Sequence, residues 1–182
     1  MRTGRWRRYI GQRKQNQGPV MLRLAIVLST LVLVAQAEAG QIYRRYVNER
    51  FGTSADIPAG WRAGPSPENG DGLRFTSPDG RAFVSVSGSL HIFDTVKEEL
   101  DILAAEPDAK VTLEKRGPAA FAQSGRRGDV IFYKKSMLSC NEQVWNHLVI
   151  EYPAAQKAQF DALVTHVAAS LAGGTGYQVD CK

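Results

Sequence analysis

Residues 70–89 read GDGLRFTSPDGRAFVSVSGS, and this stretch indicates a β-hairpin. At its centre, Pro78 presets φ near about −65°, while Asp79 and Gly80 tolerate the positive φ that a tight turn requires. The segments on either side, 72–76 and 81–90, have β character. Side chains alternate along the second segment, with Ala82, Val84, Val86 and Leu90 on one face and Phe83, Ser85, Ser87 and Ser89 on the other. The stretch therefore predicts an antiparallel hairpin with one face toward a core.

The same stretch invites a calcium-binding interpretation, because Asp71 and Asp79 lie among glycines. A calcium loop of the EF-hand type needs oxygen ligands at its first, third and fifth positions, glycine at the sixth and glutamate at the twelfth. Counted from Asn69, the fifth position is Leu73 and the twelfth is Gly80. Counted from Asp71, the third position is already Leu73. The pattern fails in both registers, so we expect no metal site and no cofactor.

Further strands are predicted on both sides of this hairpin. Two precede it, at residues 43–48 and 53–57, and an irregular loop is predicted at 61–72. Two or three more are predicted within residues 110–116, 119–124 and 129–138, and another over 143–152.

The first predicted helix begins at Thr95, because Thr95 and Glu98 have the spacing of a capping box. Val96 and Leu100 begin an apolar stripe that continues to residue 103, and Pro107 is expected to end the helix.

A second helix follows Pro153, which suits a first helical turn. Its apolar positions recur at helical spacing, at Phe160, Leu163, Val164, Val167, Ala168 and Leu171. Gly173 and Gly174 are expected to end it. The whole order is hairpin, hairpin, helix, meander, helix. It predicts an α+β fold with a single antiparallel β-sheet flanked by two helices.

Residues 1–39 are predicted to be a basic N-terminal extension and a signal peptide. Arg23 precedes an apolar run over residues 24–34, and small residues follow at Ala35, Ala37 and Ala39. A basic flank, a short apolar core and an A-x-A exit are typical of secretory signals, and the run is too short to span a bilayer. Either residues 1–20 form a long basic region or translation starts at Met21. Residues 40–182 are then one exported domain, periplasmic or secreted, with no stable membrane insertion once the leader is removed.

The basic character of the chain belongs to this leader. The full sequence has a formal net charge of +5, with 23 basic and 18 acidic residues. Residues 1–39 contain seven of the basic residues and one of the acidic ones, so the exported part has a net charge of −1. This balance excludes nucleic acid as an expected partner.

Two cysteines occur, Cys140 and Cys181, and both lie in the predicted exported domain. An even count in an oxidising compartment predicts a disulfide. The alternative is a pair of free thiols of which one is nucleophilic, and no partnering base can be identified for it in the sequence.

Three phrases, FGTSADIPAGW (51–61), GDGLRFTSPDGRAFVSVSGS (70–89) and IEYPAAQKAQFDALVTHVAASL (150–171), resemble the PsbP/Mog-like α/β/α sandwich domains, in particular uncharacterised exported bacterial members. The resemblance covers residues 43–171. Its motifs are structural, so it implies a fold and a tendency to act as a binding or accessory module. No functional residue of the family can be matched position by position.

No catalytic motif stands out in the sequence, and we assign no catalytic residue. His91 is expected on a surface loop, His147 half-buried beside a local partner, and His166 on the flank of the last helix's apolar stripe. The tripeptide Arg127-Gly128-Asp129 is predicted to be a hairpin turn and not an adhesion motif. The basic pairs at 44–45, 126–127 and 134–135 are interpreted as solvated strand edges and turns.

The function expected from the sequence is a non-catalytic exported binding or accessory domain, with an unknown envelope protein or a small ligand as partner. The alternative is a small hydrolase-like envelope enzyme whose site the sequence does not reveal. A concave pocket with convergent polar groups would distinguish the two.

Overall fold

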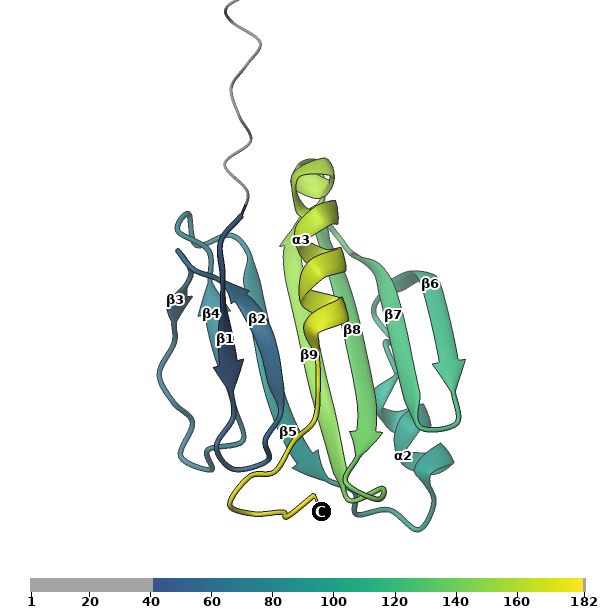
Figure 1. Cartoon of the computed structure of the whole chain (residues 1–182). Helices are drawn as coiled ribbons and strands as arrows, with labels where there is room; N and C mark the ends of the chain where they lie inside the picture. The colour runs from purple at the N-terminus through teal and green to yellow at the C-terminus, as the bar shows by residue number, and fades with distance from the viewer. Residues whose placement is uncertain (1–40, 182) are drawn as a thin grey trace, which may run out of the picture. The chain divides into compact units, whose positions relative to one another are not determined.

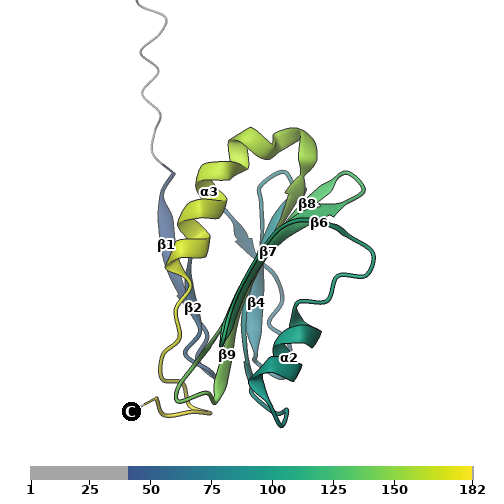
Figure 2. The same ribbon diagram turned by 90° about the vertical axis from the view of Figure 1, so that its right-hand side faces the viewer.

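The computed structural model describes residues 41–181, and the predicted leader at 1–39 lies outside them. The described residues form three layers, with a β-sheet in the middle and a helix on each face (Figure 2). This is the predicted α+β class. Within residues 41–181, no helix is both long enough and apolar enough to cross a bilayer.

The central sheet has seven antiparallel strands in the order β3-β4-β5-β9-β8-β7-β6 (Figure 1). Their bounds are Arg62–Ala63 (β3), Gly72–Thr76 (β4), Phe83–Leu90 (β5), Lys110–Gly117 (β6), Ala120–Arg127 (β7), Val130–Ser139 (β8) and Val144–Pro153 (β9). Strands that are adjacent in this sheet are also consecutive in the chain, with one exception. The exception is the pair β5 and β9, which are far apart in the sequence. That one pairing joins the β3–β5 half of the sheet to the β6–β9 half.

The first hairpin, β1 (Tyr43–Val47) and β2 (Ser54–Pro58), forms its own two-stranded sheet. The sequence led us to place all strands in one sheet, and the structure separates these two. They pack in the same layer as the last helix, on one face of the main sheet (Figures 1 and 2). Every side chain of β2 except Asp56 is buried, because the strand packs against both that helix and β5 of the main sheet.

Two helices cover the sheet. Helix α2 (Val96–Leu103) starts as predicted, with the Thr95 hydroxyl accepting a hydrogen bond from the Glu98 amide. It ends at Leu103, four residues before Pro107, and packs on the face of the sheet that carries Phe121 and Trp145. Helix α3 (Lys157–Ser170) lies on the opposite face, against β2, β8 and β9.

Both ends of α3 differ from expectation. Pro153 ends β9, and a 3-10 turn, η1 (Ala154–Gln156), lies between it and the helix. The helix stops at Ser170, ahead of the two glycines, because Leu171 is extended and Ala172 forms a β-bridge with Ser54. Gly173 serves packing instead, since a Cβ there would collide with the side chain of Ser139.

The larger core lies between the sheet and the α3 layer. It contains the predicted apolar face of α3, that of β5 apart from Leu90, which is 37% exposed, and one face of β9. Its fully buried members are Ala55, Ile57, Phe75, Val84, Val86, Leu148, Ile150 and Val167. A smaller core under α2 contains Leu100, Ala104, Phe121 and Trp145.

The turn at the centre of residues 70–89 has the predicted geometry. Gly80 has a φ of +74°, and the Asp79 carboxylate accepts hydrogen bonds from the Ser77 hydroxyl (2.6 Å) and the Arg81 amide (3.1 Å). These bonds, that of Ser77 above all, lower the pKa of Asp79 to about 2. Asp71 lies at the other end of β4, about 17 Å away along a five-residue strand. The two carboxylates therefore cannot share a cation.

The C-terminal tail runs back across the β1–β2 turn and is held there in three ways. The amides of Tyr177 and Gln178 donate hydrogen bonds to the carbonyls of Glu49 and Arg50, each at 2.9 Å. Val179 is buried in a small cluster with Phe51 and Val144. The structure also contains the predicted disulfide between Cys140 and Cys181, whose Cα atoms are 4.6 Å apart.

Replacing Gly80 with valine should lower the free energy of unfolding by about 1 kcal/mol or more, because a β-branched residue is strained at positive φ. The space around Gly80 is open, so the loss would come from the backbone alone. Gly60→Val is the matched control, since Gly60 also has open space but no positive φ. Urea denaturation of both variants measures the difference, and equal losses would contradict the prediction.

Added calcium should leave the melting temperature of the wild-type protein unchanged.

The double variant Cys140→Ser with Cys181→Ser should be less stable by roughly 4 kcal/mol, since the bond closes a loop of 41 residues in the unfolded chain. Denaturant unfolding under non-reducing conditions measures the loss. Thiol labelling of the denatured, unreduced wild-type protein should find no free cysteine. A reactive thiol would instead favour the free-thiol alternative.

Candidate functional site

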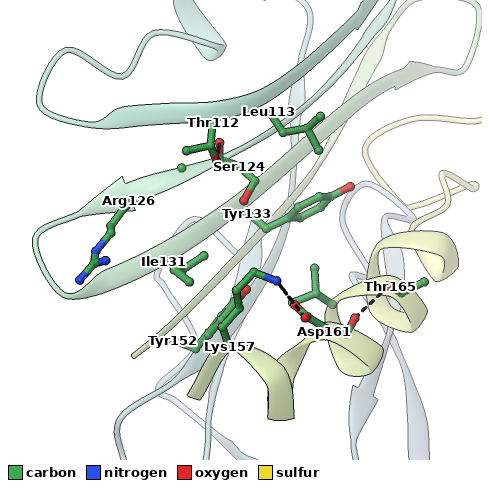
Figure 3. Close-up of a pocket in the computed structure, with 12 residues that line it drawn as sticks. Thr112, Leu113, Ser124, Arg126, Ile131, Tyr133, Tyr152, Lys157, Asp161 and Thr165 are labelled. Carbon is green, nitrogen blue, oxygen red and sulfur yellow. Dashed lines mark hydrogen bonds and ion pairs between the residues drawn. The ribbon is translucent and has the colours of Figure 1, made fainter. Parts of the chain in front are cut away.

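The most promising site is a groove between α3 and the strands beyond it, with a volume of about 440 Å³ (Figure 3). Its walls come from β6, β7, β8, the end of β9 and residues 157–165 of α3. The apolar and aromatic part of the lining consists of Leu113, Ile131, Tyr133, Tyr152 and Val164. Such a concave surface with a few polar groups at its rim is typical of ligand sites.

The groove exists because α3 covers only part of its face of the sheet. The helix packs on β8 and β9, while β6 and β7 extend beyond it with no other element of residues 41–181 in front of them (Figure 1). Tyr133 and Tyr152 thus lie where the covered part of the sheet meets the open part.

Polar groups in the groove are mostly engaged with each other. Lys157 Nζ lies 2.8 Å from both carboxylate oxygens of Asp161, and Arg126 Nη2 lies 2.8 Å from Asp129 Oδ1 outside the groove lining. Burial raises the pKa of Tyr133, and burial followed by the Asp161 charge raises that of Tyr152. Both phenols are therefore neutral at physiological pH. The groove can hold an apolar or aromatic group and offer hydroxyl groups at its wall.

The predicted basic pairs do not come together as a patch for anions. Arg45 contacts Asp56 at 3.1 Å, and Lys134 contacts Glu106 at 2.6 Å. Arg127 pairs with Glu151 at 3.0 Å. Within residues 41–181 these three cations are neutralised locally. The pair at 134–135 is not the solvated strand edge that we expected, because β8 lies inside the sheet and the Lys134 side chain is only 19% exposed.

His147 lies on the other face of the sheet, between two serines. Its Nε2 is 2.9 Å from Ser89 Oγ and its Nδ1 is 2.9 Å from Ser136 Oγ. Burial lowers the pKa of His147 to about 4, and the neighbouring Lys134 charge adds to this effect while Glu99 opposes it. The half-buried histidine with local partners is as the sequence predicted.

His91 is not the surface residue that we expected. Its ring contacts the carboxylate of Glu99, which is only 5% exposed and also accepts a hydrogen bond from Trp145 Nε1 at 2.8 Å. Sequence reasoning missed this cluster because Glu99 looked like one more charged residue in the first turn of a helix. Only the packing of α2 over Trp145 brings it inside.

The remaining candidate residues are structural. His166 stacks on Tyr43 with ring centroids 3.8 Å apart and lies 3.0 Å from Asp56 Oδ2. The Arg-Gly-Asp tripeptide forms the β7–β8 turn, where Gly128 has a φ of +56°. Among the described residues, no three His, Cys, Asp or Glu side chains are grouped so that they could hold a metal ion.

The Ser89–His147 contact has the distance of a nucleophile and its base, and Ser136 occupies the orienting position. A histidine whose pKa is near 4 is nevertheless a weak base at neutral pH, since efficient general bases titrate close to the working pH. The cluster is therefore better suited to joining β5, β8 and β9 than to activating a serine.

The burial of neutral His147 should make stability depend on pH. The free energy of unfolding should fall by up to about 3 kcal/mol as the pH drops from 6.5 toward about 4, because the unfolded chain then binds a proton that the folded chain excludes. Above about pH 6.5, His147 is neutral in both the folded and the unfolded chain, so its full contribution to the free energy of unfolding is present there. His147→Gln, which keeps polar groups but does not titrate there, should remove that part of the slope.

Urea denaturation across this pH range measures the effect, with His166→Gln as the control for loss of an exposed histidine. Wild-type and His147→Gln curves that stay parallel over the whole range would contradict a buried, neutral His147.

No protein-family model matches the sequence, and no curated protein matches it. Solved structures do match the fold. The solution structure of cyanobacterial PsbP (CyanoP) from Synechocystis sp. PCC 6803 aligns with a TM-score of 0.55 and 15% identity, covering 78% of this chain and 99% of that chain. The crystal structure of the Saccharomyces cerevisiae Ran-binding protein Mog1p aligns with a TM-score of 0.49 and 10% identity, covering 72% and 95%. The fold resemblance predicted from the sequence is thus confirmed: this chain has the PsbP-like fold.

Proposed function

We propose that this protein is a non-catalytic binding or accessory domain that acts outside the cytoplasm, in the periplasm or after secretion. The groove beside α3 is its binding site, and the partner is an envelope protein or a small ligand. The observation that carries the proposal is the groove itself, an aromatic and apolar hollow on the part of the sheet that α3 leaves uncovered.

Two features support the proposed compartment. The Cys140–Cys181 disulfide is of the kind that persists in oxidising surroundings. The sequence of residues 1–39 has the pattern of a secretory signal. Neither feature depends on the identity of the partner.

The alternative function, a small hydrolase-like enzyme, is favoured only by the Ser89–His147 contact. Both ring nitrogens of His147 are already occupied by serine hydroxyls, and burial keeps its pKa low. Labelling of Ser89 by a fluorophosphonate probe, lost in Ser89→Ala, would support the enzyme and count against a purely binding function.

Filling the groove should abolish binding without unfolding the domain. Thr165 is an exposed residue of α3 that lines the groove, so Thr165→Trp places a large side chain in it. Ala162→Trp is the matched control, because Ala162 is exposed on the same helix but does not line the groove. Each tagged protein is incubated with envelope extract, and the retained proteins and small molecules are identified by mass spectrometry.

The wild-type and Ala162→Trp proteins should retain the same partner, and Thr165→Trp should lose it while keeping its melting temperature. Full retention by Thr165→Trp would show that the groove is not the binding site.

A further inference from the structure

The two edges of the main sheet are very different. At one edge β3 has only two residues, whereas at the other β6 has eight, and all eight are exposed. An edge strand leaves a row of backbone N–H and C=O groups without a strand partner. Along β6 this row is about 27 Å long, enough to pair with an extended segment of another chain.

The side of β6 that faces the groove is basic. Lys110 pairs with Arg126, Leu113 with Ser124 and Lys115 with Ala122, so these three β6 side chains lie on the same face as the groove-lining residues of β7. Neither Lys110 nor Lys115 has an ion-pair partner within residues 41–181.

The opposite side of β6 contrasts with this. There Arg116 contacts both Glu114 and Asp101, and Glu114 also accepts a hydrogen bond from Gln123 at 2.8 Å. The uncompensated positive charge is therefore confined to the groove side. Between the two lysines lies Leu113, a groove-lining residue that is 46% exposed.

We propose that an acidic, extended segment of a partner protein adds to the sheet as a new strand beside β6. This inference rests on the proposed binding function and specifies its partner. Backbone hydrogen bonds to β6 hold the segment, acidic side chains face Lys110 and Lys115, and an apolar side chain between them packs over Leu113 into the groove.

A second copy of this chain fits the edge less well. The groove side of β6 has no acidic residue, so two such strands would bring lysines together without compensation. The β-bulge between Val111 and Leu113 works against regular pairing with either kind of strand, so the charge of β6 decides between them. An acidic partner removes the repulsion between lysines, because its carboxylates supply the charge that β6 lacks on this side.

Two synthetic octapeptides test the charge requirement. One alternates threonine with glutamate, the other alternates threonine with lysine, and both favour extended conformations to a similar degree. Fluorescence anisotropy with the full exported domain should show binding of the acidic peptide at least about tenfold tighter than that of the basic one. Binding should weaken as salt is added.

Two charge reversals locate the peptide. Lys115→Glu should lower the affinity for the acidic peptide by about tenfold. Arg62→Glu makes the same charge change on the opposite edge strand β3 and should alter that affinity by less than about twofold. Amide hydrogen exchange followed by NMR reports the pairing itself. Strand addition should protect alternate amides of β6, and a ligand confined to the groove should not.

Equal affinity for the two peptides, or no protection of β6 amides, would overturn strand addition. If Thr165→Trp still loses the envelope partner in that case, the binding function stands with a different mode of recognition. The wild-type protein without peptide could also prove to be a dimer in analytical ultracentrifugation, with the same β6 amides protected from hydrogen exchange. That result would assign the edge to a second copy and would also overturn the proposal.

Discussion

The pairing of β5 with β9 is the interaction on which the rest of the structure depends. It brings together residues more than sixty positions apart, such as Val84 and Ile150, and it makes one sheet out of two local meanders. Side chains alternate across the pair, so one face contributes Val84 and Leu148 to the main core. The other face places Ser89 next to His147. A shift of one residue in this register would exchange the two faces, burying serines in the core and exposing valines.

The groove is a consequence of where α3 lies. The helix is fourteen residues long and covers the middle of the sheet, next to the separate β1–β2 hairpin. Together these elements cover one half of that face and leave the β6–β7 half open. At the boundary, Tyr152 is buried in the main core, whereas Tyr133 is only partly buried. The uncovered half of this face is the feature on which the proposed binding function rests.

The parts of this fold that were predictable from the sequence are those set by local patterns. The turn at Asp79 and Gly80 follows from backbone preferences, and the α3 stripe follows from helical periodicity. The separation of β1–β2 from the main sheet could not be predicted, because it depends on packing between distant segments. The same holds for the groove, whose lining comes from β6, β7, β8, β9 and α3 together. Glu99 was missed because its burial depends on Trp145, which is 46 residues away.

The C-terminal tail gives the β1–β2 layer an unusual dependence on the end of the described chain. This hairpin shares no ladder hydrogen bonds with the main sheet, and its backbone links run to Ala172, Tyr177 and Gln178. The disulfide at Cys181 ties the same tail to the β8–β9 turn. Ala55 and Ile57 of β2 are fully buried in the main core, so the hairpin cannot open without disturbing that core. The tail and its disulfide thus secure a part of the core that the ladders of the main sheet do not hold, and limited proteolysis of the reduced protein would begin in the tail.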